Sequence, residues 1–215
     1  MGSKTMINSI ENLSLDQVFI SNGQLLQRSL HGALSNVVSD AVPDSIQTRS
    51  TSITTAQWTI KKPSETPRTL PESLEAYLPQ ALNVAPRTNE YLVAVLDALS
   101  TLLPHVTWIN RQAQPGQDDR FVERHRHGLI TGPGGLFECS NLTLGLALMA
   151  PDTTYPFHHH PPAEFYLVLS PGQWYREDVG WWSPGAGGAV FNPPSCIHAM
   201  KSTDAPLFAL WGLMH

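Results

Sequence analysis

The sequence predicts a mainly β fold in which a β-barrel follows an α-helical N-terminal extension. Apolar residues of the first half recur at helical spacing, whereas after Arg111 short strand-like segments are separated by turn-forming residues. We place the extension at residues 1–111 and the barrel at residues 112–215. The helices need a surface that covers their apolar stripes, so we expect the extension to pack on the barrel and not to form a separate domain.

The composition limits the classes of function. The chain is 41% hydrophobic and 14% charged, which allows a packed core and argues against disorder. Its net charge is -5 without a long run of Lys and Arg, which argues against nucleic-acid binding. No apolar run reaches the roughly 18 residues of a membrane span, and residues 1–22 lack a secretory pattern. We therefore expect a cytoplasmic protein without nucleic-acid or membrane partners, and we find no indication of an oligomeric state.

Four segments of the extension have a recognisable character. Residues 13–38 show helical spacing interrupted at Asn22 and Gly23, which predicts two short helices. Residues 40–64 are rich in Pro, Ser and Thr, which predicts a surface loop. Residues 71–78 carry acidic side chains in a first turn, which predicts a helix start. Residues 88–103 combine a capping sequence with a broad apolar stripe, which predicts the clearest helix of the chain.

Short strands follow in the second half. Leucines at every second position of residues 142–148 predict a strand with one buried face. Clusters of Pro, Gly or Asp separate the later segments. Many short strands with regular turn signals are typical of a sandwich or a barrel. The further strand-like segments are residues 165–169, 173–176, 189–191 and 207–211.

Three consecutive histidines and a nearby glutamate form the clearest candidate site. Successive side chains of an extended strand point to opposite faces, so His158 and His160 share one face. Glu164 and Tyr166 form a second pair on one face, and we expect a fourth ligand from His198, which follows a proline turn. Imidazoles and a carboxylate inside a barrel suit one divalent metal such as Zn(II), Fe(II), Mn(II), Co(II) or Ni(II). The residue types do not select among these ions.

This layout resembles the cupin superfamily, whose fold is a double-stranded β-helix, or jelly-roll, barrel. The first cupin motif, HxH followed by three or four residues and Glu, is matched by the two histidines and the glutamate named above. The second motif, G-x5-P-x-G-x2-H, is matched at Gly187, Pro193 and His198. Ser195 stands where this motif has glycine. Two linked motifs at a plausible separation indicate a metal-binding cupin barrel.

A stretch of roughly residues 142–211 resembles the cupin-type dimethylsulfoniopropionate (DMSP) lyases, the DddL/DddQ/DddW group. The resemblance rests on the run from residue 155 to residue 169, then Gln173-Trp174, and then residues 193–200. Known members cleave DMSP to dimethyl sulfide and acrylate with a bound divalent metal. The resemblance implies core ligands at His160, Glu164 and His198, a ligand or close neighbour at His158, a metal-adjacent tyrosine at Tyr166, and a second pocket tyrosine at Tyr155.

The implied substrate is a zwitterionic sulfonium carboxylate, and its chemistry gives the aromatic residues possible roles. Elimination needs a base beside the carbon next to the carboxylate, and strand alternation favours Tyr166 over Tyr155 as that base. A phenol has an ordinary pKa of about 10, so it needs a neighbouring cation to act at neutral pH. Rings such as those of Tyr155 and Trp174 can face the sulfonium through cation–π attraction.

Two alternatives stay open. Another metal-dependent cupin enzyme, a dioxygenase or an isomerase, has the same ligand spacing, although an oxygenase needs no phenolic base. A non-catalytic ligand-binding cupin is the second alternative. A further HxH pair, His125 and His127, lies between arginines and has no acid at cupin spacing. We interpret this pair as solvated or intersubunit and not as a metal site.

Overall fold

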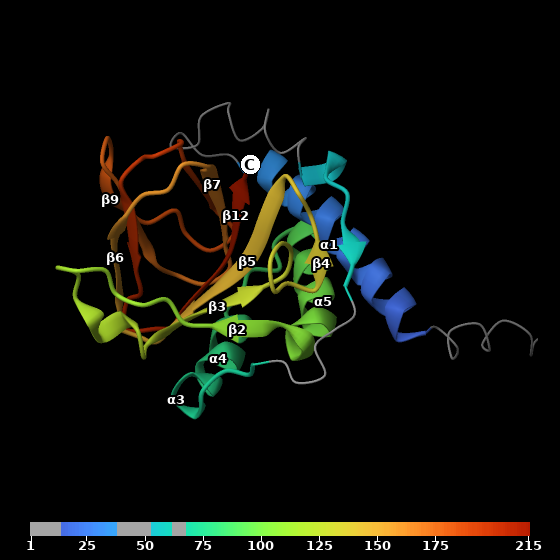
Figure 1. The fold of residues 1–215 in the computed structure, drawn as a ribbon, viewed down its shortest axis with the longest axis horizontal. Helices are drawn as coiled ribbons and strands as arrows, with labels where there is room; N and C mark the ends of the chain where they lie inside the picture. The colour runs from blue at the N-terminus through green and yellow to red at the C-terminus, as the bar shows by residue number, and fades with distance from the viewer. Residues whose placement is uncertain (1–13, 38–52, 62–67) are drawn as a thin grey trace, which may run out of the picture.

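The computed structural model describes residues 14–37, 53–61 and 68–215, and its helical half and its strands lie side by side as in Figure 1. None of the described helices is long and apolar enough to cross a bilayer. The helices and helical turns are α1 (Leu15–Ser35), α3 (Glu72–Glu75), α4 (Tyr77–Asn83), α5 (Glu90–Leu102), η1 (Leu103–His105) and η2 (Asp119–Phe121).

Helix α1 is continuous, so the prediction of two short helices is wrong. Ser14 and Gln17 form a capping box at its start. Gly23 does not break the helix, because it serves for close packing: a Cβ built there would stand 2.6 Å from the ring of Phe137. The asparagine before it is accommodated as well, since its side chain donates to the carbonyl of Val18. Residues 13 and 38 of the predicted segment lie outside the described residues.

Two further predictions for the extension are confirmed, and a third concerns residues that are described only in part. Helix α5 confirms the strongest prediction, and the Asn89 side chain caps it by accepting from the Leu92 amide. The helix start at residue 72 is also confirmed, as α3 and α4 follow one another there. The predicted loop at residues 40–64 is described only in part. Residues 53–55 of it form a helical turn, and β1 (Thr59–Ile60) pairs with β4 (Phe137–Glu138), so that part is not irregular.

The barrel consists of two antiparallel sheets, which confirms the mainly β fold with a helical extension. One has six strands in the order β10-β7-β12-β5-β3-β2, and the other has four in the order β6-β11-β8-β9. The remaining strands are β2 (Thr107–Ile109), β3 (His125–Leu129), β5 (Leu142–Met149), β6 (Thr154–His158), β7 (Ala163–Val168), β8 (Gln173–Arg176), β9 (Gly180–Trp182), β10 (Ala189–Asn192), β11 (His198–Lys201) and β12 (Leu207–Met214).

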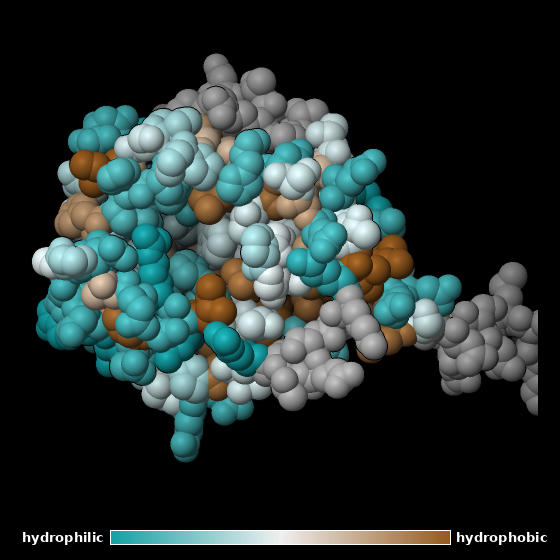
Figure 2. All heavy atoms as spheres, viewed as in Figure 1, coloured by the Kyte–Doolittle hydropathy of each residue, from teal (hydrophilic) through white to brown (hydrophobic). Residues whose placement is uncertain are grey.

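Strand β5 is buried on both faces, which corrects the prediction of a single buried face. Its leucines, such as Leu144 and Leu146, belong to the core that the sheet shares with α1 and α5. Ala147 and Met149 point the other way, into the barrel. The sequence shows only the leucine face clearly, because alanine and glycine occupy much of the other one. On the side drawn in Figure 2, the surface over this core is mostly hydrophilic, with hydrophobic side chains in small separate groups.

The inner face of the six-stranded sheet carries the polar side chains. Tyr166 of β7 stands opposite Trp211 of β12, and both belong to the barrel core. Strand β3, which the sequence did not predict, adds His127 to the same face, opposite Ile109 of β2. Residues from four strands of one sheet thus face the histidines of the other sheet.

Candidate metal centre

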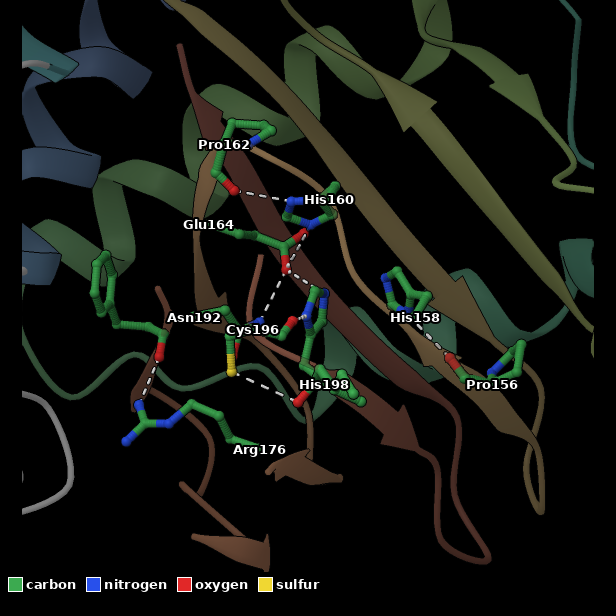
Figure 3. A network of polar contacts seen from close by, with 11 residues as sticks. Pro156, His158, His160, Pro162, Glu164, Arg176, Asn192, Cys196 and His198 are labelled. Carbon is green, nitrogen blue, oxygen red and sulfur yellow. Dashed lines mark hydrogen bonds and ion pairs between the residues drawn. The ribbon is translucent and has the colours of Figure 1, made fainter. Parts of the chain in front are cut away.

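Three histidines meet where the four-stranded sheet faces the glutamate of β7 (Figure 3). His158 ends β6, and the pairing of β11 with β6 brings His198 directly beside it. His160 stands two residues beyond the end of β6. One ligand atom from each ring lies within 4.8 Å of the other two. This cluster groups His158 with the expected ligands His160 and His198.

Hydrogen bonds to backbone carbonyls orient all three rings. The Nδ1 atom of His158 donates to the Pro156 carbonyl at 2.9 Å, and that of His160 donates to the Pro162 carbonyl at 2.9 Å. The Nδ1 atom of His198 donates to the Cys196 carbonyl at 2.8 Å. A carbonyl only accepts, so each Nδ1 carries the proton and each Nε2 keeps its lone pair. This is the tautomer that binds a metal through Nε2.

Glu164 supplies a negative oxygen to the same point. Its Oε2 lies 3.0 Å from Nε2 of His198 and 3.5 Å from Nε2 of His160, and it accepts a 2.9 Å hydrogen bond from the Asn192 side chain. Yet the buried Nε2 atoms of these two histidines have no well-aligned hydrogen-bond partner among the described residues. Lone pairs that converge without bonding one another fit a shared divalent cation.

The ionisation of Glu164 and His158 suits a cation, whereas at His160 burial is outweighed by the hydrogen bond and charge of Glu164, which raise its pKa. Burial raises the pKa of Glu164, but the contacts with His160 and His198 outweigh burial and hold the pKa below its usual range. Burial and the neighbouring His198 lower the pKa of His158 to about 3. A carboxylate and a neutral imidazole are the forms that bind metal. The metal identity is not set by these donors, since all the candidate ions accept them.

A cavity of about 260 Å³ opens beside the cluster. Its wall combines the metal-facing side chains with apolar residues of the six-stranded sheet. The lining residues are Ile109, Asn110, Arg111, His127, Leu129, Tyr155, His158, His160, Glu164, Tyr166, Trp211 and Leu213. Three of the four proposed ligands, both candidate tyrosines and one tryptophan therefore line a single space, and His198 lies behind it beside His158.

The two candidate tyrosines line this cavity from different sheets. Burial raises the pKa of Tyr155 to about 12, although the positive charge of Arg111 opposes the rise. Burial and the charge of Glu164 raise the pKa of Tyr166 well above its ordinary value. Without a further cation both phenols are protonated at neutral pH. A role as base therefore requires a positive charge close to the phenol.

His125 is buried and His127 is half-buried at the cavity wall, so their interpretation as solvated or intersubunit residues is wrong. His125 is fully buried with its ring 4.7 Å from that of Tyr155, and His127 lies 5.2 Å from the ring of Trp211. Burial lowers the pKa of His127 to about 4, and burial also holds the pKa of His125 well below its ordinary value. The missed signal was the alternation of residues 125–129, which places both histidines on the inner face of one strand.

Trp174 lies behind the cavity wall. Its side chain is fully buried, with its ring 6.0 Å from that of Tyr166, and it is not one of the lining residues. Trp211 lines the cavity instead. Sequence reasoning missed Arg111 and the apolar wall of Ile109, because these residues belong to an edge strand and the turn after it.

Fold and site together define a metal-binding cupin barrel. The chain belongs to the dimethylsulfoniopropionate (DMSP) lyase family, whose pattern matches residues 45–209. The DMSP lyase DddQ of Ruegeria pomeroyi is 32% identical over 91 residues, which cover 42% of this chain. The chain spans about half the length of the curated relatives it matches, 45% and 53%.

Solved structures agree with the fold. The crystal structure of DddQ from Ruegeria pomeroyi superposes with a TM-score of 0.67 at 23% identity and covers 93% of this chain and 92% of its own. A structure reported with the DMSP lyases RdDddP and RnDddQII has a TM-score of 0.66 at 18% identity, covering 92% and 94%. The superpositions extend over the helical half as well as the barrel.

Proposed function

We propose that this protein is a lyase that cleaves DMSP to dimethyl sulfide and acrylate by metal-assisted β-elimination. One observation carries the proposal: three imidazoles and one carboxylate converge beside a cavity that two tyrosines line. Membership of the DMSP lyase family supports the choice of substrate. An oxygenase would use the same ligands, but it would give the two phenols no role.

The proposed ligands are His158, His160, Glu164 and His198. A divalent cation held by them would attract the substrate's carboxylate, stabilise negative charge that develops next to it and favour a nearby phenolate. The chain's own contribution is the orientation of the donors. Asn192 holds the Glu164 carboxylate, and three backbone carbonyls hold the imidazoles.

Tyr166 is the proposed base. Its phenolate takes the proton from the carbon next to the carboxylate, and the electrons of that C–H bond form the new C=C bond. The bond between the β-carbon and sulfur breaks, and its electron pair leaves with sulfur as neutral dimethyl sulfide. The products are acrylate and a protonated Tyr166, which returns its proton to solvent. Charge and atoms balance without an oxidant or a second substrate.

Tyr155 is the proposed substrate-binding tyrosine and the alternative base. Its ring lies 4.9 Å from that of His158, and both residues line the cavity. Trp211 offers an aromatic surface to the sulfonium, since it lines the cavity. Trp174 would contribute to substrate binding through its contact with Tyr166.

The deciding experiment is headspace detection of dimethyl sulfide after DMSP is added to purified protein of known metal content. We expect release of dimethyl sulfide with an equal amount of acrylate, and none from the Glu164→Ala variant. Oxygen uptake without dimethyl sulfide would instead indicate a dioxygenase. Binding of DMSP without turnover in metal-loaded protein would indicate a non-catalytic binding protein.

A further inference from the structure

One cationic side chain at the cavity has no role in the elimination described above. Among the twelve described lining residues, Arg111 is the single Lys or Arg. It stands two residues beyond the end of β2, and its exposed side chain lies at the cavity's edge, with the guanidinium carbon 5.9 Å from the ring centroid of Tyr155. A guanidinium stays charged at every physiological pH.

The structure gives this charge no acidic partner. Other arginines of the described residues pair with carboxylates, as Arg87 does with Asp97, but Arg111 forms no ion pair within 4.0 Å among those residues. Its charge nevertheless borders the cavity, because Arg111 is one of the lining residues. Glu164, the one acidic lining residue, is already engaged by two histidines and Asn192.

We propose that Arg111 binds the carboxylate of the substrate together with the cation, and so sets the direction in which the substrate lies in the cavity. A guanidinium matches a carboxylate with two parallel N–H···O bonds or with one bond to each of two acceptors. The inference rests on the proposed function for the identity of the ligand, a short carboxylate that carries a cationic group.

The direction follows from charge. A sulfonium and a guanidinium repel one another, so the cationic end of the substrate lies away from Arg111. The apolar and aromatic surface of Trp211 and Leu213 is on β12, which β3 and β5 separate from β2. Tyr166 stands directly opposite Trp211 in the register. The carbon between the two charged ends then lies on the side of the proposed base.

A second role for Arg111 makes a different prediction. If its charge served only to ease deprotonation of Tyr155, loss of Arg111 would lower kcat and leave carboxylate affinity unchanged. If it binds the carboxylate, loss of Arg111 raises KM and the dissociation constant of simple carboxylates. The comparison of a carboxylate with its uncharged amide separates the two roles.

The test measures binding of propionate and of propionamide to metal-loaded protein by calorimetry. In Arg111→Gln we expect the Kd for propionate to rise about 10- to 100-fold, the usual effect of losing a charge-assisted hydrogen bond. The Kd for propionamide should stay within about twofold. Arg111→Lys should lose less, because it keeps the charge without the planar fork. Arg87→Gln is the matched control, because it removes an exposed arginine that does not line the cavity.

Equal propionate affinity in Arg111→Gln and in the unaltered protein would overturn the inference. So would a parallel loss of propionate and propionamide, which would indicate a change of cavity shape. The melting temperature of each variant checks folding. If the melting temperature of Arg111→Gln is lowered, the propionate affinity of Arg111→Lys decides the question instead. If DMSP yields no dimethyl sulfide while propionate binding still depends on Arg111, the proposed function fails and the carboxylate site stands.

Discussion

The two faces of the six-stranded sheet are made by the same strands, yet they differ in chemistry. The outer face is mainly apolar: Phe165 and Leu167 of β7 and Leu210 of β12 join the core formed with α1 and α5. The inner face alternates with it and carries Glu164 and Tyr166. Burial on the outer face contributes stability, whereas burial on the inner face changes the ionisation of the groups that it covers. We therefore expect substitutions on the inner face to change metal binding and activity, and substitutions on the outer face to change stability.

Removal of an inner-face ligand should have the largest effect. We expect Glu164→Ala, His160→Ala and His198→Ala each to lose bound metal and reduce dimethyl sulfide release to background. His158→Ala should do the same, because its ring belongs to the same cluster. Elemental analysis measures the bound metal and the headspace assay measures activity. His159→Ala is the control, because His159 is exposed. Full metal occupancy in any one variant would remove that residue from the ligand set.

Removal of the whole helical layer tests the outer face. We propose that residues 1–111 pack on the barrel and are not a separate domain. Residues 112–215 expressed alone should then be poorly soluble, because they lose the helices that cover the outer face together with β2. Sedimentation and thermal melting of the fragment provide the measurement. A soluble, cooperatively melting and active fragment would contradict the proposal.

Variants of the two inner-face tyrosines distinguish the proposed base from the proposed substrate-binding residue. Tyr166→Phe should lower kcat about 10²- to 10⁴-fold, the range for loss of a general base, while metal content stays near normal. Tyr155→Phe should act mainly on KM. Both variants keep the ring that packs in the barrel, so folding is preserved. If Tyr155→Phe loses turnover and Tyr166→Phe retains it, the two roles must be exchanged.

An outer-face leucine should affect stability alone. Leu146 is fully buried against the helical layer, so Leu146→Ala should lower the free energy of unfolding by about 2–5 kcal/mol. The kcat per folded molecule should not change, because the side chain points away from the cavity. Chemical denaturation beside the lyase assay distinguishes the two quantities. A fall in kcat at full folding would show that the two faces are coupled.

The smallest expected effect concerns pH and His125. Burial lowers its pKa in the folded protein, whereas the unfolded chain binds a proton near pH 6.5. As the pH falls below about 6.5 the unfolded state takes up a proton that the folded state excludes, so stability decreases. His125→Phe should reduce this slope by about 1 kcal/mol per pH unit between pH 6.5 and 5. Denaturation at several pH values measures the slope, with His159→Asn for comparison.

Features that depend on contacts between residues close in the sequence were predictable, and features that depend on distant residues were not. The cluster was predictable, because His158, His160 and Glu164 lie within one short segment, which joins β6 to β7 and so keeps them close together in space. The continuity of α1 was not, since Gly23 is explained by Phe137, far along the chain. His125 likewise stands next to Tyr155 only after β3 has joined the sheet.

The hydrogen bonds that hold the three imidazoles have a consequence for how the site is assembled. Each ring is fixed by a carbonyl only two residues away along the chain, and two of these carbonyls belong to prolines, whose φ angle is restrained. The rotational freedom of the donors is therefore lost when the local backbone folds, before any ion arrives. An ion that enters meets donors already in place, and its affinity is not reduced by the entropy of ordering three side chains.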